Sequence, residues 1–163
     1  MLISAELAAA INEQIGNEYG ANLQYVSIAA YFEREKLKLL SKLFFEQAEE
    51  EKEHALKFVK YVLDTQAELR IPAIPAPRPT FASAEEAVAA ALKWETDVTA
   101  QITRLMQIAV DKNDYMSQSF LQWFIDEQLE EINKMDQLLT VVRRSGERNL
   151  LMVEAYLVHI SKS

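Results

Sequence analysis

The chain has 163 residues, of which 50% are hydrophobic, and this is enough for one well-buried domain. It contains no cysteine, so disulfides and thiolate metal sites are excluded, and any metal must be held by oxygen and nitrogen ligands. The formal net charge of −8 argues against nucleic acid as a partner and favours cations.

Two long helices are predicted in the N-terminal half by the period of the apolar residues. The first should run from about Ser4 to Arg34, and the second from about Leu39 to Leu69. Near its middle, each apolar stripe is interrupted by ionisable residues. These are Glu18 in the first helix, and Glu51 with His54 in the second.

The segment after the second helix holds all four prolines, between Pro72 and Pro79, so it should be extended rather than helical. From Leu69 to Ser83 it can span on the order of 45 Å, at roughly 3.1 Å per residue. A helix of about 30 residues is about as long, so this segment can cross the whole length of a bundle. The connections near Lys36 and Asn113 are short and predict antiparallel neighbours.

Two further long helices are predicted in the C-terminal half. The third should begin after Ser83, which starts a capping box, and it carries Glu95 on its inward stripe. The fourth should run from about Asp114, a good N-cap, to about Arg144. Gln128 and Glu131 fall on the inward stripe of this fourth helix.

A short fifth helix is predicted from about Glu147 to Ile160, after Gly146 ends the fourth helix in the left-handed conformation. It is too apolar for free exposure, so we expect it to be buried against a partner subunit. The expected fold is therefore all-α, an antiparallel four-helix bundle with one long crossover and a short C-terminal helix. Residues 1–145 would form the bundle with its site, and residues 146–163 the C-terminal helix at a subunit contact.

The polar residues on the inward stripes predict a metal centre. Glu51 and His54 are three residues apart and project from the same side of one helix, although this spacing alone is a weak signal. An ionised carboxylate in a helical core costs several kcal/mol, yet Glu18, Glu95 and Glu131 are also inward. A pair of bound cations explains all four carboxylates most economically. Carboxylates with one imidazole suit iron, manganese or zinc.

The same residues resemble the motifs of the ferritin family, and more closely those of its non-haem bacterial branch. The resemblance covers essentially the whole chain, and ferritin-like di-iron proteins are themselves the standard example of a metal centre in a helical bundle. It rests on Asn17-Glu18-Tyr19, Tyr25, the run from Glu49 to Ala55, Glu95, and the runs from Phe120 to Phe124 and from Glu127 to Glu131.

The resemblance implies two iron ions at the middle of the bundle. Glu18, Glu51 and His54 would hold the first iron. Glu51 would bridge to the second, which Glu95 and Glu131 would also hold. Since bacterioferritin and rubrerythrin-like proteins repeat Glu-x-x-His on the fourth helix and this chain does not, the second iron is expected to bind more weakly.

Further residues receive roles from the same resemblance. Gln128 would hydrogen-bond near the second iron, and Tyr25 would lie beside the centre, where it hydrogen-bonds to it or donates an electron. The alternative for Tyr25 is a core residue with a satisfied hydroxyl. Glu50, Glu127 and Glu130 resemble a third iron site, and the alternative for them is a solvated acidic face.

The function implied by the resemblance is iron storage and detoxification. A ferroxidase centre would oxidise Fe(II) with dioxygen and deposit a ferric oxyhydroxide mineral inside a hollow shell of twenty-four subunits. The alternatives are a rubrerythrin-like di-iron peroxidase and an inactive structural or storage subunit. No haem is expected, because Lys52 stands where bacterioferritin has its haem-ligating methionine. The N-terminus does not resemble a signal peptide and no apolar run could span a membrane, so we expect a cytoplasmic protein without a membrane partner.

Overall fold

The computed structural model describes residues 1–162, and within this range the chain forms helices and no strand. Ser163, the last residue of the predicted segment 146–163, lies outside the described residues. None of the helices in this range is both long enough and apolar enough to cross a bilayer. The elements are α1 (Ala5–Arg34), α2 (Lys38–Asp64), α3 (Ala84–Asp111), α4 (Tyr115–Ser145), a 3₁₀ turn η1 (Glu147–Asn149) and α5 (Leu150–Ser161).

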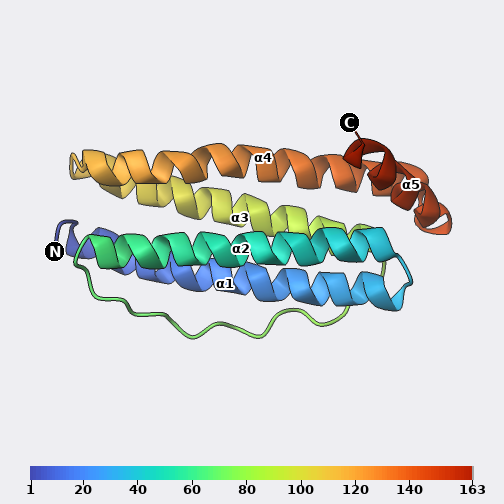
Figure 1. The fold of residues 1–163 in the computed structure, drawn as a ribbon, viewed down its shortest axis with the longest axis horizontal. Helices are drawn as coiled ribbons and strands as arrows, with labels where there is room; N and C mark the ends of the chain where they lie inside the picture. Colours follow the sequence, from blue (N-terminus) through green and yellow to red (C-terminus); the bar gives the residue numbers. More distant parts are fainter. Residues whose placement is uncertain (163) are drawn as a thin grey trace.

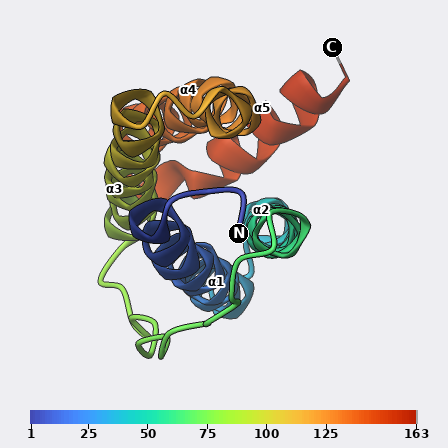
Figure 2. The ribbon, with the colours of Figure 1, turned by 90° about the vertical axis from the view of Figure 1, so that its left-hand side faces the viewer.

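The four long helices form an antiparallel bundle made of two hairpins. Figure 1 shows α1 and α2 side by side as the first hairpin, and α3 and α4 as the second. The segment between α2 and α3 runs along the outside of the bundle from one end to the other, and the end view in Figure 2 places it beyond α1. The predicted fold class, including the single long crossover and the short fifth helix, is confirmed.

Three of the long helices end in the same hydrogen-bonded motif without a glycine. The residue after each C-cap has a positive φ, which is 64° at Lys36, 60° at Gln66 and 54° at Asn113. At the end of α2, the N–H of Gln66 donates to the carbonyl of Leu63 and the N–H of Ala67 to that of Val62, which is a Schellman motif. This motif ends α2 at Asp64, so the predicted end near Leu69 was too late by five residues.

The remaining helix ends follow the predicted capping chemistry with two differences. Asp114 caps α4 by accepting the N–H of Ser117 at 2.9 Å. Ser83 caps α3, but the carboxylate of Glu86 accepts from the N–H of Ala82, one residue before the position that a capping box uses. Gly146 follows α4 with φ 75° and ψ 162°, a region open essentially to glycine alone, rather than in the left-handed helical conformation expected.

Two buried amides of α1 hold the crossover along its length. The side chain of Asn12 donates to the carbonyl of Glu68 at 2.8 Å and accepts from the N–H of Arg70 at 3.0 Å. Gln24 makes the same reciprocal pair with the backbone of Arg78, at 2.9 and 3.1 Å. These bonds satisfy backbone groups of an extended segment that has no neighbouring strand to pair with.

The two glycines of α1, Gly16 and Gly20, allow close packing. A Cβ atom at Gly16 would lie 2.5 Å from Cγ of Pro72 in the crossover, closer than carbon atoms approach one another. A Cβ atom at Gly20 would lie 3.3 Å from the ring of Trp94 on α3. The first contact fixes how closely the crossover can approach α1.

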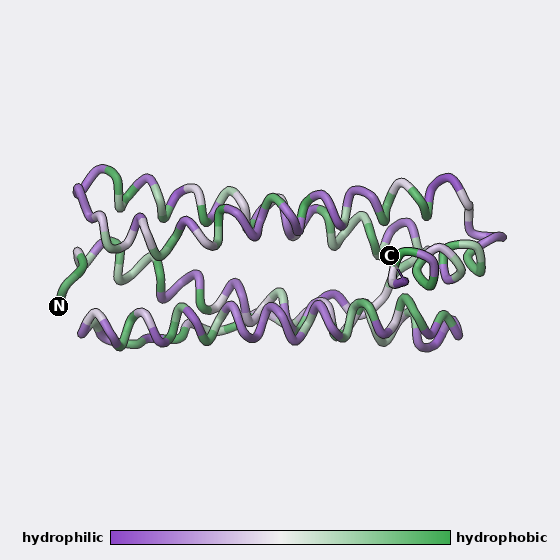
Figure 3. The backbone as a smooth tube through the Cα atoms, turned by 45° about the horizontal axis from the view of Figure 1, so that its top comes forward, coloured by the Kyte–Doolittle hydropathy of each residue, from purple (hydrophilic) through white to green (hydrophobic). Residues whose placement is uncertain are grey.

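The hydrophobic core is divided into two clusters at the two ends of the bundle. One contains Phe32, Phe44 and Met135, and the other contains Ile11 and Phe58. Between them, the inward stripes of all four helices carry buried polar residues. Figure 3 shows hydrophilic and hydrophobic residues alternating along the four long helices, as expected for helices that bury one face.

The fifth helix packs against the end of the bundle with one face only. Val153 and Leu157 are buried, whereas Leu151 and Met152 remain 75% and 64% exposed in the single chain. Such a large exposed apolar surface is typical of a contact with another protein surface. The exposed face of α5 is the surface that would make the predicted subunit contact. The division of the chain into a bundle and a C-terminal segment at that contact stays a prediction.

Candidate metal centre

Four carboxylates and one imidazole converge between the two apolar clusters. They come from the middle of each long helix: Glu18 from α1, Glu51 and His54 from α2, Glu95 from α3 and Glu131 from α4. All five are buried, with exposed fractions between 1% and 5%. The convergence follows from the antiparallel bundle, in which the middles of all four helices share one level.

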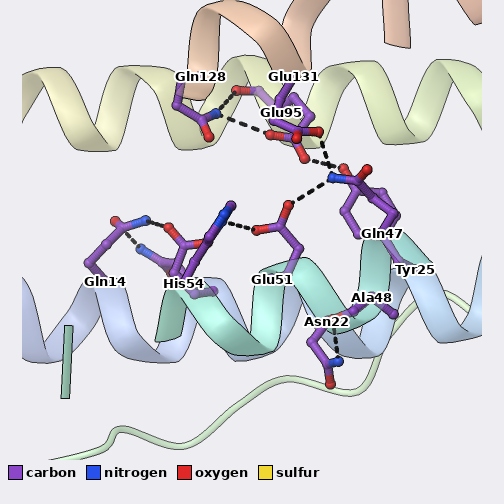
Figure 4. A network of polar contacts seen from close by, with 12 residues as sticks. Gln14, Asn22, Tyr25, Gln47, Ala48, Glu51, His54, Glu95, Gln128 and Glu131 are labelled. Carbon is purple, nitrogen blue, oxygen red and sulfur yellow. Dashed lines mark hydrogen bonds and ion pairs between the residues drawn. The ribbon is translucent and has the colours of Figure 1, made fainter. Parts of the chain in front are cut away.

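The five side chains form two groups that share one residue. Glu18, Glu51 and His54 bring ligand atoms within 4.8 Å of one another, and so do Glu51, Glu95 and Glu131. Figure 4 shows Glu51 between His54 on one side and Glu95 with Glu131 on the other. This is the division expected for two cations, with Glu51 placed to bridge them.

The first group contains a carboxylate oxygen that lacks a hydrogen-bond donor. Nδ1 of His54 lies 3.1 Å from Oε2 of Glu51 and 3.9 Å from Oε2 of Glu18. Gln14, one turn before Glu18, donates to Oε1 of Glu18 at 2.9 Å. Oε2 of Glu18 is buried without a hydrogen-bond partner. A buried acceptor of this kind fits a cation ligand, because an unpaired buried polar atom is otherwise costly.

In the second group, the carboxylate of Glu95 is held by polar side chains from α1 and α4. The hydroxyl of Tyr25 donates a hydrogen bond to Oε1 of Glu95. The amide of Gln128 donates to Oε2 of Glu95 at 3.1 Å and to the Thr99 hydroxyl at 3.1 Å. Tyr25 and Gln128 therefore lie beside the centre as expected, and both orient the carboxylate of Glu95.

Burial makes three of the carboxylates hard to ionise in the metal-free protein. Burial, followed by the charge of Glu51, raises the pKa of Glu18 well above its usual value. The same two causes raise the pKa of Glu95 to about 9. Burial raises the pKa of Glu131 to about 7, although Lys134 acts in the opposite direction. These shifts reflect burial and then the charge of neighbouring carboxylates, and bound cations would oppose both effects.

Glu51 and His54 behave as an ion pair within this environment. Burial acts to raise the pKa of Glu51, but the hydrogen bond and charge of His54 outweigh it and leave the pKa lowered. Burial likewise acts to lower the pKa of His54, and the contact with Glu51 leaves it raised. A cation can bind His54 only through a deprotonated nitrogen of the imidazole, so a contact that raises the pKa of His54 makes cation binding depend on pH.

The donor set suits hard or intermediate cations. Four carboxylates carry four negative charges when ionised, which two divalent cations would balance. The ligand atoms are oxygens and one imidazole nitrogen, a combination suited to iron, manganese or zinc. The aromatic rings of Trp123 and Phe124 lie edge-on to His54, with ring centroids at 5.4 and 5.9 Å, and shield the imidazole.

The three residues expected at a third site do not form a comparable group. Among residues 1–162, two groups bring three ligand atoms within 4.8 Å, and Glu50, Glu127 and Glu130 belong to neither. Glu50 and Glu127 are half-buried, while Glu130 is exposed. The charges of two of them act on the centre, because Glu50 raises the pKa of Glu131 and Glu127 raises the pKa of His54. A third site there stays a prediction.

Two residues at the centre were not anticipated from the sequence. Gln47 is fully buried one turn before Glu51 and donates to both Glu51 and Glu131, and Lys134 donates to Gln47. The signal for Gln47 was present, since a polar residue four positions before Glu51 lies on the same inward stripe. No periodic signal marks Lys134, whose exposed position on α4 looks like that of an ordinary surface lysine.

Comparisons with known proteins agree with this architecture. Residues 8–145 match the family model for the ferritin-like domain. Ferritin BfrB of Mycobacterium tuberculosis is 42% identical over 148 residues, covering 91% of this chain and 81% of the relative. A bacterial non-heme ferritin of Staphylococcus epidermidis is 36% identical over 146 residues, covering 90% and 88%. Among solved structures, an open pore ferritin from Archaeoglobus fulgidus has a TM-score of 0.92 at 30% identity, covering 95% of this chain and 97% of that one.

Proposed function

This chain belongs to the ferritin family, and we propose that it stores iron by oxidising Fe(II) at the buried centre. The observation that carries this proposal is that Glu51 belongs to both groups of ligand atoms, so that one carboxylate can bridge two cations. The ferritin relatives support iron storage, and the two carboxylate and imidazole groups are compatible with a di-iron site.

In the proposed reaction, Fe(II) is the substrate and dioxygen the oxidant. Each Fe(II) gives one electron, so a pair supplies the two electrons that, with two protons, reduce dioxygen to hydrogen peroxide. The bridging carboxylate brings the two ions close enough to act on one dioxygen. Tyr25 and Gln128 keep Glu95 oriented towards the second ion. We also propose that Tyr25, whose hydroxyl contacts Glu95 directly, can supply an electron when a single Fe(II) is bound. The Fe(II) then gives one electron and the phenol gives one electron and its proton, so that dioxygen with one further proton becomes hydrogen peroxide and a tyrosyl radical remains.

The fate of the product is part of the proposal. Fe(III) would leave for the cavity of a shell of twenty-four subunits and grow there as a ferric oxyhydroxide mineral. Glu50, Glu127 and Glu130 would form a third iron position on that route. The cytoplasm is the proposed location, and fractionation of cells followed by detection of the protein in each fraction would test it.

The deciding experiment combines size-exclusion chromatography with an anaerobic Fe(II) titration followed by air. We expect a large homo-oligomer that binds about two Fe(II) per chain tightly and oxidises them rapidly. An inactive storage subunit would assemble without fast oxidation. A rubrerythrin-like peroxidase would oxidise Fe(II) much faster with hydrogen peroxide than with dioxygen and would turn over with an added electron donor. Either result would contradict the proposed ferroxidase function and support the corresponding alternative.

A further inference from the structure

The buried amide of Gln47 connects the two hairpins at the centre. Its Nε2 donates to Oε1 of Glu51 at 3.2 Å, one turn away on α2, and to Oε2 of Glu131 at 2.5 Å, across the bundle on α4 (Figure 4). Its Oε1 accepts from Nζ of Lys134 at 2.8 Å. Both amide hydrogens and the carbonyl oxygen therefore have partners, and the two hydrogens go to two residues of the second metal group.

Lys134 determines which end of the amide faces the metal centre. An ammonium group can only donate hydrogen bonds, and an ionised carboxylate can only accept them. With the amide reversed, the carbonyl oxygen of Gln47 would face Glu51 and Glu131, and its NH₂ group would face the ammonium of Lys134. The observed orientation is thus the one that satisfies all four groups, and Lys134 favours it from the outer side.

The amide offsets the repulsion between two carboxylates that must stay close. Glu51 and Glu131 come from different hairpins, and the charge of Glu51 raises the pKa of Glu131. A neutral donor shared between them holds both without occupying all their lone pairs, because each carboxylate offers about four acceptor positions. The carboxylates are then already placed when a second cation arrives, and outer-shell hydrogen bonds of this kind orient metal ligands.

A matching arrangement exists at the first group. Gln14 lies four residues before Glu18, just as Gln47 lies four residues before Glu51. Its Nε2 donates to Oε1 of Glu18 at 2.9 Å, and its Oε1 accepts from Asn17 at 3.2 Å. Gln14 is likewise buried, but it touches no residue of α3 or α4 through its amide. It therefore provides a matched amide that serves the first group alone.

We propose that Gln47 is a positioning residue for the second cation, and that Lys134 acts through it by fixing the orientation of its amide. This inference rests on the proposed function, since it assumes that Glu51, Glu95 and Glu131 bind a cation. Loss of the Gln47 amide should weaken the binding of the second cation and leave the binding of the first unchanged. The first cation keeps Glu18, His54 and the Gln14 contact, and Gln47 donates to Oε1 of Glu51 whereas His54 lies beside Oε2.

The test is a titration of the full-length, assembled protein with Co(II) under anaerobic conditions. Co(II) is chosen because it resists oxidation during the measurement. Its visible absorption reports how the ion is coordinated. Calorimetry and the absorption bands should resolve two Co(II) per wild-type chain. In Gln47→Leu we expect the second dissociation constant to rise by about 10- to 100-fold, with the first unchanged. In Gln14→Leu the first constant should rise instead. Gln47→Val serves as a second variant if Gln47→Leu does not assemble.

The outcomes separate this inference from the proposed function. If the wild-type chain binds no pair of Co(II) ions, the proposed function itself is wrong. If the wild type binds two, but Gln47→Leu binds both like the wild type or weakens both equally, the role of Gln47 is wrong.

Lys134 is tested by a double-mutant cycle with Co(II). Lys134→Met should weaken binding of the second Co(II) in the wild-type background but not in the Gln47→Leu background. Lys134→Arg keeps the positive charge and should bind Co(II) like the wild type. If Lys134→Met has the same effect in both backgrounds, its charge acts independently of Gln47 and the proposed role of Lys134 is overturned.

Discussion

Glu154, on α5, accepts a hydrogen bond from the backbone N–H of Leu40, in the first turn of α2, at 2.9 Å. Its other carboxylate oxygen accepts from the N–H of Leu39 at 3.1 Å. Leu37, the N-cap of α2, makes no side-chain cap, so Glu154 takes that role from a helix more than 100 residues away. A negative charge at a helix N-terminus also interacts favourably with the helix dipole. The contact fixes α5 on the end of the first hairpin.

Replacing this long-range cap should loosen α5. In Glu154→Ala we expect a loss of about 1 kcal/mol, the usual effect of losing an N-cap, and a melting temperature lower by roughly 2–4 °C. If α5 forms the predicted subunit contact, the assembly should also dissociate at a higher protein concentration. Calorimetry and analytical ultracentrifugation would measure the two effects. Glu13→Ala, at an exposed position of α1, is the control. Equal melting and assembly of both variants would contradict the role of Glu154.

Loss of the bridging carboxylate should abolish fast oxidation. In Glu51→Gln we expect the initial rate of Fe(II) oxidation to fall by at least about 100-fold, because even outer-shell partners of metal sites matter by 10- to 100-fold. His54→Ala should have a similar effect. Glu53→Gln, at an exposed position of the same helix, should oxidise iron like the wild type. Stopped-flow absorption after mixing with air-saturated buffer would measure the rates. A normal initial rate in Glu51→Gln would show that oxidation occurs elsewhere.

The metal-free protein should lose stability as the pH rises, because of Glu95. Burial and Glu51 raise the pKa of Glu95 to about 9 in the folded state, against 4.5 for a free carboxyl group. Below pH 4.5 the contribution of the protonated group is fully present. Above pH 4.5, ionisation of Glu95 lowers the free energy of the unfolded chain, whereas in the folded chain Glu95 stays protonated until about pH 9. The free energy of unfolding therefore falls between pH 4.5 and about pH 9. Glu131 acts in the same direction up to about pH 7.

The measurement for Glu95 is a series of thermal melts with a chelator present. We expect the melting temperature of the metal-free wild type to fall from pH 5.5 to pH 8.5, and the fall to be smaller in Glu95→Gln. Asp97→Asn removes an exposed carboxylate from the same helix and should keep the wild-type slope. A slope in Glu95→Gln equal to that of the wild type would mean that Glu95 is not the group that titrates.

The close contact between α1 and the crossover predicts effects of very different size at two glycines. Alanine usually stabilises a helix interior by about 0.5–1 kcal/mol relative to glycine. Gly16→Ala should nevertheless destabilise the protein by roughly 1–3 kcal/mol, because its Cβ would lie 2.5 Å from Pro72 and push the crossover outward. Gly20→Ala meets Trp94 at 3.3 Å and should change stability much less. Urea unfolding would measure the free energy of unfolding of both variants. If Gly16→Ala is more stable than the wild type, the crossover can move away from α1 at little cost.

The third iron position can be tested at an exposed residue. If Glu130 helps to move iron away from the centre, Glu130→Ala should slow mineral growth during repeated Fe(II) additions and leave the first, fast oxidation unchanged. Glu49→Ala, an exposed carboxylate on α2, is the control. Unchanged mineral growth in Glu130→Ala, together with no metal beside Glu50 in crystals soaked briefly in Fe(II), would leave a solvated acidic face as the explanation.

The sequence predicted the bundle and the convergence of the charged residues because both follow from periodicity. Glu18, Glu51, Glu95 and Glu131 interrupt otherwise apolar stripes at similar depths in their helices, so an antiparallel bundle must bring them together. The length and proline content of the crossover predicted its path in the same way. These features depend on the spacing of residues along the chain, which the sequence records directly.

Other features depend on tertiary contacts and left no such signal. The ends of α1, α2 and α3 use Lys36, Gln66 and Asn113 at positive φ, where glycine is the usual residue, so the end of α2 was misplaced. The link from Lys134 to Gln47 joins two hairpins and depends on rotamers. Hydrogen bonds between side chains distant in sequence require the packed structure before they can be recognised.

The division of the ligands between the hairpins has a consequence for the order of folding. The first group, Glu18, Glu51 and His54, lies entirely within the hairpin of α1 and α2, so its members are closer in sequence than those of the second group, which extends to Glu131. The second group adds Glu95 and Glu131 from the other hairpin, across the long crossover. Because local contacts usually form earlier than distant ones, the first group can assemble when one hairpin closes, and the second only when the hairpins dock. A cation in the second group would then slow unfolding rather than speed folding, and would prolong the lifetime of the native chain.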